Sequence, residues 1–311
     1  MEKKSTRVAY GEMLERCGSD SRIVVLDADL SSCTMTVGFA RKWPDRFFNC
    51  GIAEANMIGV AAGLAACGNI VFANSFAMFM AGRCFEQIRN SVAYPCLNVK
   101  LIGTHAGLSV GEDGATHQCL EDVAAMRAIP NMTILNPCDA NETRECVKAA
   151  IEHDGPVYLR LGRPAVDNVT ESRTGYSFRL GKGIVLMDGE DAAIIATGIM
   201  VHEAVRAAEQ LRGEGICVQV IDMPTIKPLD EALVLEAAQT GLIVTAEEHN
   251  LYGGLGEAVA RVLTACAPTA QECVAVKDVF GHSGKVDMLM ERYGLTARSI
   301  VEAVKRGLKR R

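Results

Sequence analysis

The sequence predicts an α/β protein built from two doubly wound domains, and three observations support this fold class. The chain has 311 residues, about twice the length of a typical domain. Hydrophobic residues make up 49% of it and charged residues 23%, a composition that can fill large cores. Apolar runs of strand length alternate with amphipathic stretches of helix length, which is typical of parallel sheets covered by helices.

The first half of the chain carries five candidate strands, with helical intervals between them. These strands are the apolar runs at 22–28, 69–75, 98–104, 131–137 and 156–162. The alternation then stops, and Asn, Ser, Thr and Gly accumulate as they would in a linker. We therefore predict a first domain over residues 1–165 and a linker over residues 166–188.

The alternation resumes in the second half, which predicts a smaller doubly wound domain over residues 189–311. Its candidate strands are the apolar runs at 191–198, 217–223, 241–248 and 272–279. The stretch GGLGEAV at 253–259 has some likeness to a dinucleotide-binding loop. However, it follows its strand by several residues, and Val259 stands where the third small residue belongs. A non-catalytic, nucleotide-binding subunit is therefore a disfavoured alternative.

The charge balance and the cysteine pattern exclude several classes of protein. Lys and Arg total 32 against 38 Asp and Glu, so no basic face for nucleic acid is implied. We find no apolar stretch long enough for a signal peptide or a membrane span, and we expect a cytoplasmic protein. The 12 cysteines stand singly, without a CxxC pair or a zinc-ligand spacing to the six histidines. We expect reduced thiols and no metal held by this chain.

Glu54 is the first candidate functional residue. It lies in the segment RFFNCGIAEANMIGVAAGLA, where a short strand reaches Gly51 and an apolar helix begins. Glu54 could be an exposed first-turn acid that complements the helix dipole. Alternatively, a carboxyl group buried among these apolar neighbours could stay protonated and donate a hydrogen bond. The spacing alone leaves both interpretations open.

A second candidate region is the loop in GTHAGLSVGEDGATHQCLEDVAAMR, residues 103–127. It follows a strand and presents His105, Glu112, Asp113 and His117. Loops at the ends of parallel strands are where α/β proteins bind ligands. Asp and Gly are also common turn formers, but two histidines and two acids so close together favour a polar site.

Two further segments have competing interpretations. The segment NSFAMFMAGRCFEQIRN places three phenylalanines, Phe76, Phe79 and Phe85, on a predicted helix, where aromatic residues usually form core. Arg160 and Arg163 close the first domain, where they could clamp an anionic group or cap a strand at the surface.

Taken together and in this order, the motifs GIAEANMIG, FANSFAMFMAGR and THAGLSVGEDGATHQ make the chain resemble the C-terminal half of transketolases. More specifically, it resembles the separate C-terminal subunit of split transketolases, with a pyrimidine-binding domain followed by a C-terminal domain. The resemblance covers essentially the full length. It implies transfer of a two-carbon ketol unit from a ketose to an aldose, dependent on thiamine diphosphate.

The resemblance also implies a role for each matched residue. Glu54 would bind a ring nitrogen of the aminopyrimidine and activate the cofactor, and His117 would handle protons at the substrate hydroxyls. The other implied cofactor contacts are Phe76 by stacking, Phe79 by lining the same pocket, and Asp29. The other implied substrate contacts are Asp113 at a hydroxyl, His105, Arg163 and Arg7 at an anionic group, and Cys33 where phosphate-binding relatives carry a serine.

Transketolases hold a divalent metal such as Mg²⁺ and the diphosphate through a Gly-Asp-Gly motif, and this sequence contains no such motif. The resemblance therefore implies an N-terminal partner subunit that carries the diphosphate domain and the metal, in an α2β2 assembly acting on anionic sugars. Two relatives with the same two-domain plan remain alternatives: a 1-deoxyxylulose-phosphate synthase-like enzyme and a 2-oxo acid dehydrogenase beta subunit.

Overall fold

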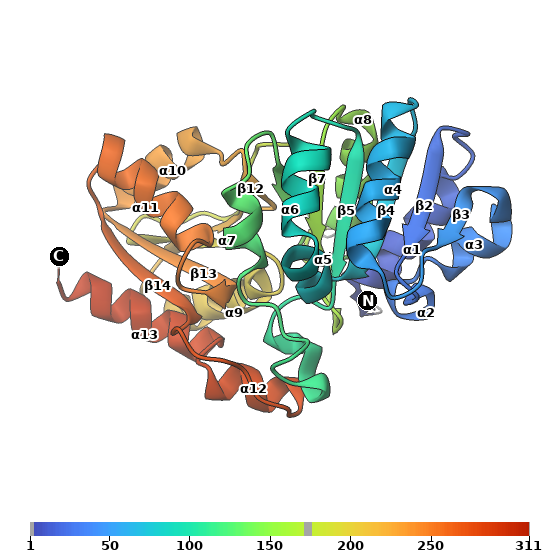
Figure 1. Cartoon of the computed structure of the whole chain (residues 1–311). Coiled ribbons are helices and arrows are strands. Elements are labelled where there is room, and N and C mark those ends of the chain that lie inside the picture. Colours follow the sequence, from blue (N-terminus) through green and yellow to red (C-terminus); the bar gives the residue numbers. More distant parts are fainter. Residues whose placement is uncertain (1–2, 171–175, 311) are drawn as a thin grey trace.

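The computed structural model describes residues 3–170 and 176–310, which form two sheets lying side by side with helices packed against them (Figure 1). The larger sheet has the strand order β12-β6-β7-β5-β4-β2-β3, and the smaller has the order β14-β13-β10-β11-β9. A separate short pair joins β1 (Lys4–Ser5) to β8 (Ala165–Val166). The predicted α/β fold class with two domains is confirmed.

The larger sheet contains all five strands predicted for the first half of the chain. Its strands are β2 (Ile23–Asp27), β3 (Phe47–Asn49), β4 (Ile70–Phe76), β5 (Val99–Thr104), β6 (Thr133–Leu135), β7 (Val157–Arg160) and β12 (Thr225–Lys227). All neighbours are parallel except β12. Along β4, Ile70 and Phe72 enter one core while Val71 and Ala73 enter another, so both faces of the sheet are buried. This explains the near-continuous apolar runs of the sequence.

Helices and helical turns connect these strands. They are α1 (Thr6–Cys17), α2 (Ser31–Thr34), α3 (Val37–Lys42), η1 (Pro44–Arg46), α4 (Glu54–Ala66), α5 (Ala77–Arg83), α6 (Phe85–Gln87), η2 (Ile88–Ala93), η3 (Leu108–Asp113), α7 (Asp122–Arg127) and α8 (Ala140–Glu152). The side chain of Asp139 caps α8 by accepting a hydrogen bond from the N–H of Glu142 at 2.8 Å.

The phenylalanine segment differs from the single core helix expected for it. Phe76 ends β4, where it pairs with Thr104 of β5, and the helix α5 begins only at the following residue. Phe79 lies on α5, whereas Phe85 starts α6 and is 36% exposed. The prediction of core was therefore wrong for Phe85, because the chain breaks between α5 and α6 and turns that ring outward.

The smaller sheet contains the four strands predicted for the second half. Its strands are β9 (Ile184–Met187), β10 (Ala192–Ala196), β11 (Val218–Asp222), β13 (Leu242–Asn250) and β14 (Ala270–Val276). All neighbours are parallel except β9, which lies within the span assigned to the linker and pairs antiparallel with β11. The helices here are α9 (Met200–Gly213), α10 (Glu231–Ala237), η4 (Ala238–Thr240), α11 (Leu255–Cys266), α12 (Val286–Arg292) and α13 (Ala297–Leu308).

Strand β12 connects the two domains in a way that the sequence did not predict. It follows β11 in the chain but pairs antiparallel with β6, so it forms the edge of the larger sheet. Three residues followed by a proline carry too little pattern to indicate a strand. Among the helices that the structure describes, none has the length and apolar character needed to cross a membrane.

Candidate active site

The candidate site residues follow the ends of neighbouring parallel strands. Phe76 ends β4, His105 directly follows β5, and Arg163 lies shortly after β7. The strands β4, β5 and β7 are adjacent and parallel, so their carboxyl ends open at one edge of the sheet. That edge is where open α/β sheets bind ligands.

Glu54 is buried at the start of α4. Its side chain is only 4% exposed, and its helix also buries Met57, Ile58 and Ala61. This excludes the interpretation of Glu54 as an exposed first-turn acid. The carboxylate is nevertheless not surrounded only by apolar groups, because Nη1 of Arg83 donates a hydrogen bond to its Oε1 at 2.6 Å. Arg83 was missed as a site residue although it closes the motif FANSFAMFMAGR.

Four rings and the Arg83 guanidinium form a continuous row leading away from Glu54. The guanidinium of Arg83 lies 4.0 Å from the ring centroid of Phe79. Phe79 stacks on Phe76 with 5.7 Å between centroids and meets His117 edge-on at 5.3 Å. At the far end, the rings of Phe76 and His105 lie 4.0 Å apart. Two helices, two strand ends and one loop therefore bring these predicted residues together.

His105 lies in a corner beside the positive charges of Arg7 and Arg163. One nitrogen of Arg7, Nη1, lies 3.4 Å from Nε2 of His105 and also donates to the carbonyl oxygen of Cys33 at 2.8 Å. Burial, together with the charges of Arg7 and Arg163, lowers the pKa of His105 to about 3, so this imidazole is neutral at pH 7. Cys33 contributes its carbonyl oxygen to this corner.

One buried donor in this corner has no partner. Nε of Arg7 makes no hydrogen bond among the described residues, although it is shielded from solvent. Burial also lowers the pKa of Arg7. A buried N–H without an acceptor is costly, and an anionic ligand would satisfy it.

The remaining predicted residues lie outside this row or at its rim. Asp113 and Arg163 are 3.7 Å apart, both about two-fifths exposed, and Arg163 also donates to the carbonyl oxygen of Val110. Asp29 is exposed and accepts a hydrogen bond from Nδ2 of Asn49 at 2.8 Å. Its φ of 65° gives it the strained backbone common at functional turns.

The second domain fixes the shape of the loop that carries His105 and His117. Buried Glu248 accepts a hydrogen bond from the N–H of Ser109 at 2.5 Å, and Nε2 of Gln118 donates to the carbonyl oxygen of His282 at 3.0 Å. Figure 1 shows η3 of this loop lying beside α12. Sequence reasoning assigned the second domain no role, because these contacts join residues far apart in the chain.

Arg160 serves this same junction. Its Nε donates to Oδ2 of Asp122 at 2.8 Å, and its Nη2 donates to the carbonyl oxygen of Glu248 at 2.9 Å. The hydroxyl of Tyr158 donates to the same Asp122 oxygen at 2.7 Å. Arg160 is 4% exposed, so its charge is committed to holding the two domains together.

The glycine stretch at 253–259 cannot accept a nucleotide diphosphate in this conformation. Glu247 occupies the start of α11 by accepting the N–H groups of Leu255 and Gly256, each at 2.7 Å. A Cβ added at Gly254 would lie 2.0 Å from the same carboxylate. The helix N-terminus that would bind a phosphate is therefore filled by the chain's own acid.

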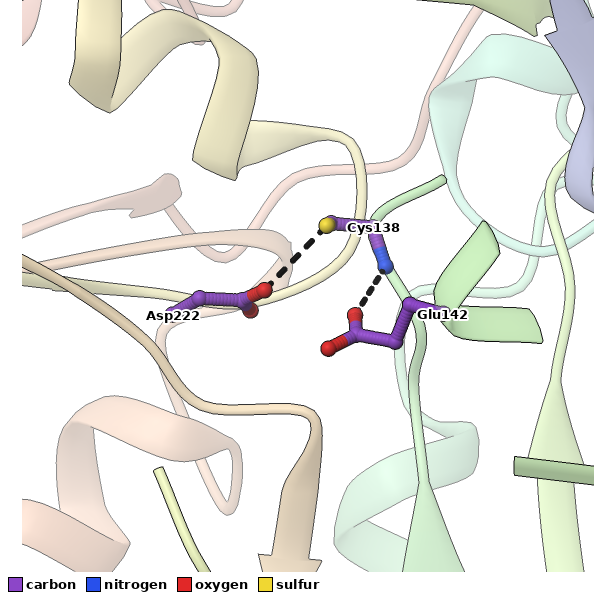
Figure 2. Close-up of side chains that lie close together, drawn as sticks. All are labelled: Cys138, Glu142 and Asp222. Carbon is purple, nitrogen blue, oxygen red and sulfur yellow. Dashed lines mark hydrogen bonds between the residues drawn. The ribbon is translucent and has the colours of Figure 1, made fainter. Parts of the chain in front are cut away.

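Three buried acidic groups also meet where the domains join (Figure 2). The thiol of Cys138 donates to Oδ2 of Asp222 at 3.2 Å, while Glu142 accepts the N–H of Cys138 at 2.8 Å and the hydroxyl of Tyr176 at 3.0 Å. Burial raises the pKa of Glu142 to about 7 and that of Asp222 well above its usual range. Because both Glu142 oxygens already have donors, we interpret this set as a hydrogen-bonded cluster of acids that retain their protons.

Comparison with known proteins identifies the family. The family described as "Transketolase, pyrimidine binding domain" matches residues 2–168, and "Transketolase, C-terminal domain" matches residues 181–300. A transketolase C-terminal section from Methanocaldococcus jannaschii is 48% identical over 309 residues, covering 99% of this chain and 97% of that protein.

Two further comparisons concern subunits of split enzymes. A 6-deoxy-6-sulfo-D-fructose transketolase subunit from Clostridium sp. is 47% identical, covering 94% of this chain and 90% of that one. A solved split-gene transketolase, described as an inactive beta4 tetramer, is 49% identical with a TM-score of 0.90, covering 99% of both chains. The chain therefore belongs to the transketolase family of transferases, carries its pyrimidine-binding and C-terminal domains, and is similar throughout to the C-terminal subunits of split transketolases.

Proposed function

We propose that this chain is the C-terminal subunit of a thiamine-diphosphate-dependent transketolase. It would transfer a two-carbon ketol unit from an anionic ketose to an aldose, together with an N-terminal partner subunit. The observation that carries the proposal is the row of contacts from buried Glu54 through Arg83, Phe79 and Phe76 to His105 and His117. It joins a carboxyl group, stacking surfaces and imidazoles at one sheet edge.

The residues present fit a cofactor that carries an aminopyrimidine ring. A buried carboxyl group can exchange a hydrogen bond with a ring nitrogen, and the paired phenyl rings of Phe76 and Phe79 suit stacking. When bound, thiamine diphosphate supplies the carbanion chemistry of ketol transfer. In this proposal Glu54 holds a proton at the ring nitrogen, and His117 exchanges protons with the substrate hydroxyls.

The anionic end of the sugar would bind at the corner formed by Arg7, His105 and Arg163. The unpartnered Nε of Arg7 supports this assignment, and guanidinium groups suit phosphate and sulfonate oxygens. The relatives named for 6-deoxy-6-sulfo-D-fructose and apulose-4-phosphate act on sugars with such groups. Cys33 and Asp113 lie at this corner and its rim, and we assign them to substrate binding with Arg163.

The requirement for a partner rests on the missing Gly-Asp-Gly motif. Because the sequence has no such motif, we assign the diphosphate and a divalent metal such as Mg²⁺ to an N-terminal subunit, and we propose an α2β2 assembly. Asp29 stays a proposed cofactor contact. The cytoplasmic location and the domain boundaries at 165 and 189 also stay predictions.

The test is reconstitution with the partner subunit, thiamine diphosphate and Mg²⁺. Ketose and aldose phosphates should give transfer products, whereas pyruvate should not serve as a donor. Consumption of pyruvate would instead indicate a 1-deoxyxylulose-phosphate synthase or a 2-oxo acid dehydrogenase subunit. Glu54→Gln should lower kcat by at least a hundredfold. The matched control is Glu86→Gln, at an exposed acid on α6. Near-normal kcat in Glu54→Gln at limiting cofactor would refute the assignment.

A further inference from the structure

Arg83 holds one oxygen of the carboxyl group that the proposed cofactor needs. It ends α5, reaches across to α4, and its Nη1 donates to Oε1 of Glu54 at 2.6 Å. Its guanidinium also covers one face of the Phe79 ring, 4.0 Å from the centroid. One residue therefore contacts both the acid and an aromatic ring assigned to the pyrimidine.

The ion pair is asymmetric in its exposure to solvent. The side chain of Glu54 is 4% exposed, whereas that of Arg83 is 48% exposed. Withdrawing a carboxylate from water is costly unless a cation accompanies it. Arg83 is the single ion-pair partner of Glu54 in the described part of the chain. Arg83 therefore stabilises Glu54 in its ionised form.

The neighbouring thiol cannot substitute for Arg83. Burial, together with the charge of Glu54, raises the pKa of Cys84 to about 12, so this thiol stays neutral at pH 7. Cys84 also directs its thiol to the carbonyl oxygen of Phe79 at 3.6 Å. The charge on Glu54 therefore depends on Arg83 and not on the adjacent cysteine.

We propose that Arg83 is a positioning residue that keeps Glu54 ionised while the pyrimidine is absent and must release it when the ring binds. The inference rests on the proposed function. Arg83 and a ring nitrogen compete for the same carboxyl group, and the half-exposed Arg83 can move into solvent with its charge intact. Glu54 then takes up one proton from the buffer acid, whose conjugate base remains in solution, and donates the new O–H as a hydrogen bond to the ring nitrogen. The same movement uncovers the face of Phe79.

The first experiment needs neither cofactor nor partner. Infrared spectra of the chain alone at pH 7 report protonated carboxyl groups by their C=O stretch. Wild type and Arg83→Lys should show no band that depends on Glu54. Arg83→Gln should gain one such band, which should vanish in the double variant Arg83→Gln/Glu54→Gln. Circular dichroism verifies that each variant is folded, and Arg89→Gln, at an exposed arginine bonded to Asn90, is the matched control.

The second experiment measures cofactor binding by the complete complex with its partner and Mg²⁺. Calorimetry in two buffers with different ionisation enthalpies reports proton uptake. Wild type should take up protons on binding thiamine diphosphate. Arg83→Gln should take up fewer and bind with a dissociation constant roughly 3- to 10-fold lower, because no ion pair has to open.

Two results would overturn the proposal. One is a folded Arg83→Gln chain without the Glu54 band, and the other is unchanged or weaker cofactor binding with undiminished proton uptake. These failures differ from failure of the proposed function. Full activity of Glu54→Gln would remove the cofactor role of Glu54 whatever the infrared spectra show, whereas a missing band alone would remove only the role of Arg83.

Discussion

The imidazole of His105 lies 3.4 Å from the guanidinium of Arg7 and remains neutral because its surroundings are buried and positively charged. With its pKa lowered to about 3, His105 is neutral throughout the physiological range. We therefore expect no titration of its ring between pH 5 and 8, measured by NMR of the histidine ring protons. A midpoint near the ordinary histidine value would contradict this geometry.

Arg7 should determine affinity for charged sugars more than for neutral ones. Loss of a charge-assisted hydrogen bond costs about 1.5–3 kcal/mol, so Arg7→Gln should raise KM for phosphorylated or sulfonated substrates roughly 10- to 100-fold. KM for an uncharged analogue should change little. Steady-state kinetics with both substrates measures the difference, and Arg41→Gln, at an exposed arginine of α3, is the control. An equal loss for both substrates would place Arg7 outside the anion site.

The Arg160–Asp122 pair should be a major contributor to stability at the domain junction. Its side chains are 5% and 0% exposed, so Arg160→Met leaves Asp122 as an uncompensated buried charge. The expected loss is about 3–5 kcal/mol in the free energy of unfolding. Urea denaturation followed by circular dichroism measures this loss. The exposed pair Arg298–Glu291 is the control, and breaking it with Arg298→Gln should cost less than about 1 kcal/mol.

The acid cluster in Figure 2 should make stability fall as the pH rises. Burial raises the pKa of Glu142 from an ordinary value of 4.5 to about 7 in the folded chain. Its stabilising contribution is therefore complete below about pH 4.5 and is lost as the pH rises through about 7. Glu142→Gln removes this titration while keeping the shape of the side chain.

Urea midpoints measured from pH 5 to pH 8 test the expectation. Wild type should lose more stability over this interval than Glu142→Gln does, and Glu145→Gln, at an acid paired with Lys148 on the same helix, should behave as wild type. Identical slopes for wild type and Glu142→Gln would mean that Glu142 is ionised in the folded protein.

Most strands of the two sheets could be predicted because they are buried on both faces. The runs that became β2, β4 and β5 need apolar residues at nearly every position, and such runs are visible without knowledge of the fold. Burial of Glu54 followed from one of two interpretations of its apolar neighbours. By contrast, β12 depends on pairing with β6, some ninety residues earlier, and a three-residue segment gives no periodic pattern.

The difference between local sequence patterns and long-range contacts also decides which residues of the candidate site could be predicted. Motifs indicated Phe76, His105 and His117, because each motif lies within one continuous stretch of chain. The partner of Glu54 could not be identified in this way, since Arg83 reaches it only after α4 and α5 have packed. Glu248 and His282 support the loop from the other domain, and no local spacing connects them to Ser109 or Gln118.

The placement of β12 limits how this polypeptide can be divided. A fragment ending at residue 170 would retain β6 but lose the strand that covers its outer side. Its unpaired backbone groups would then be available to other molecules, which favours aggregation. We therefore expect a chain divided at this point to aggregate more readily than the intact chain, even though each half resembles an independent unit.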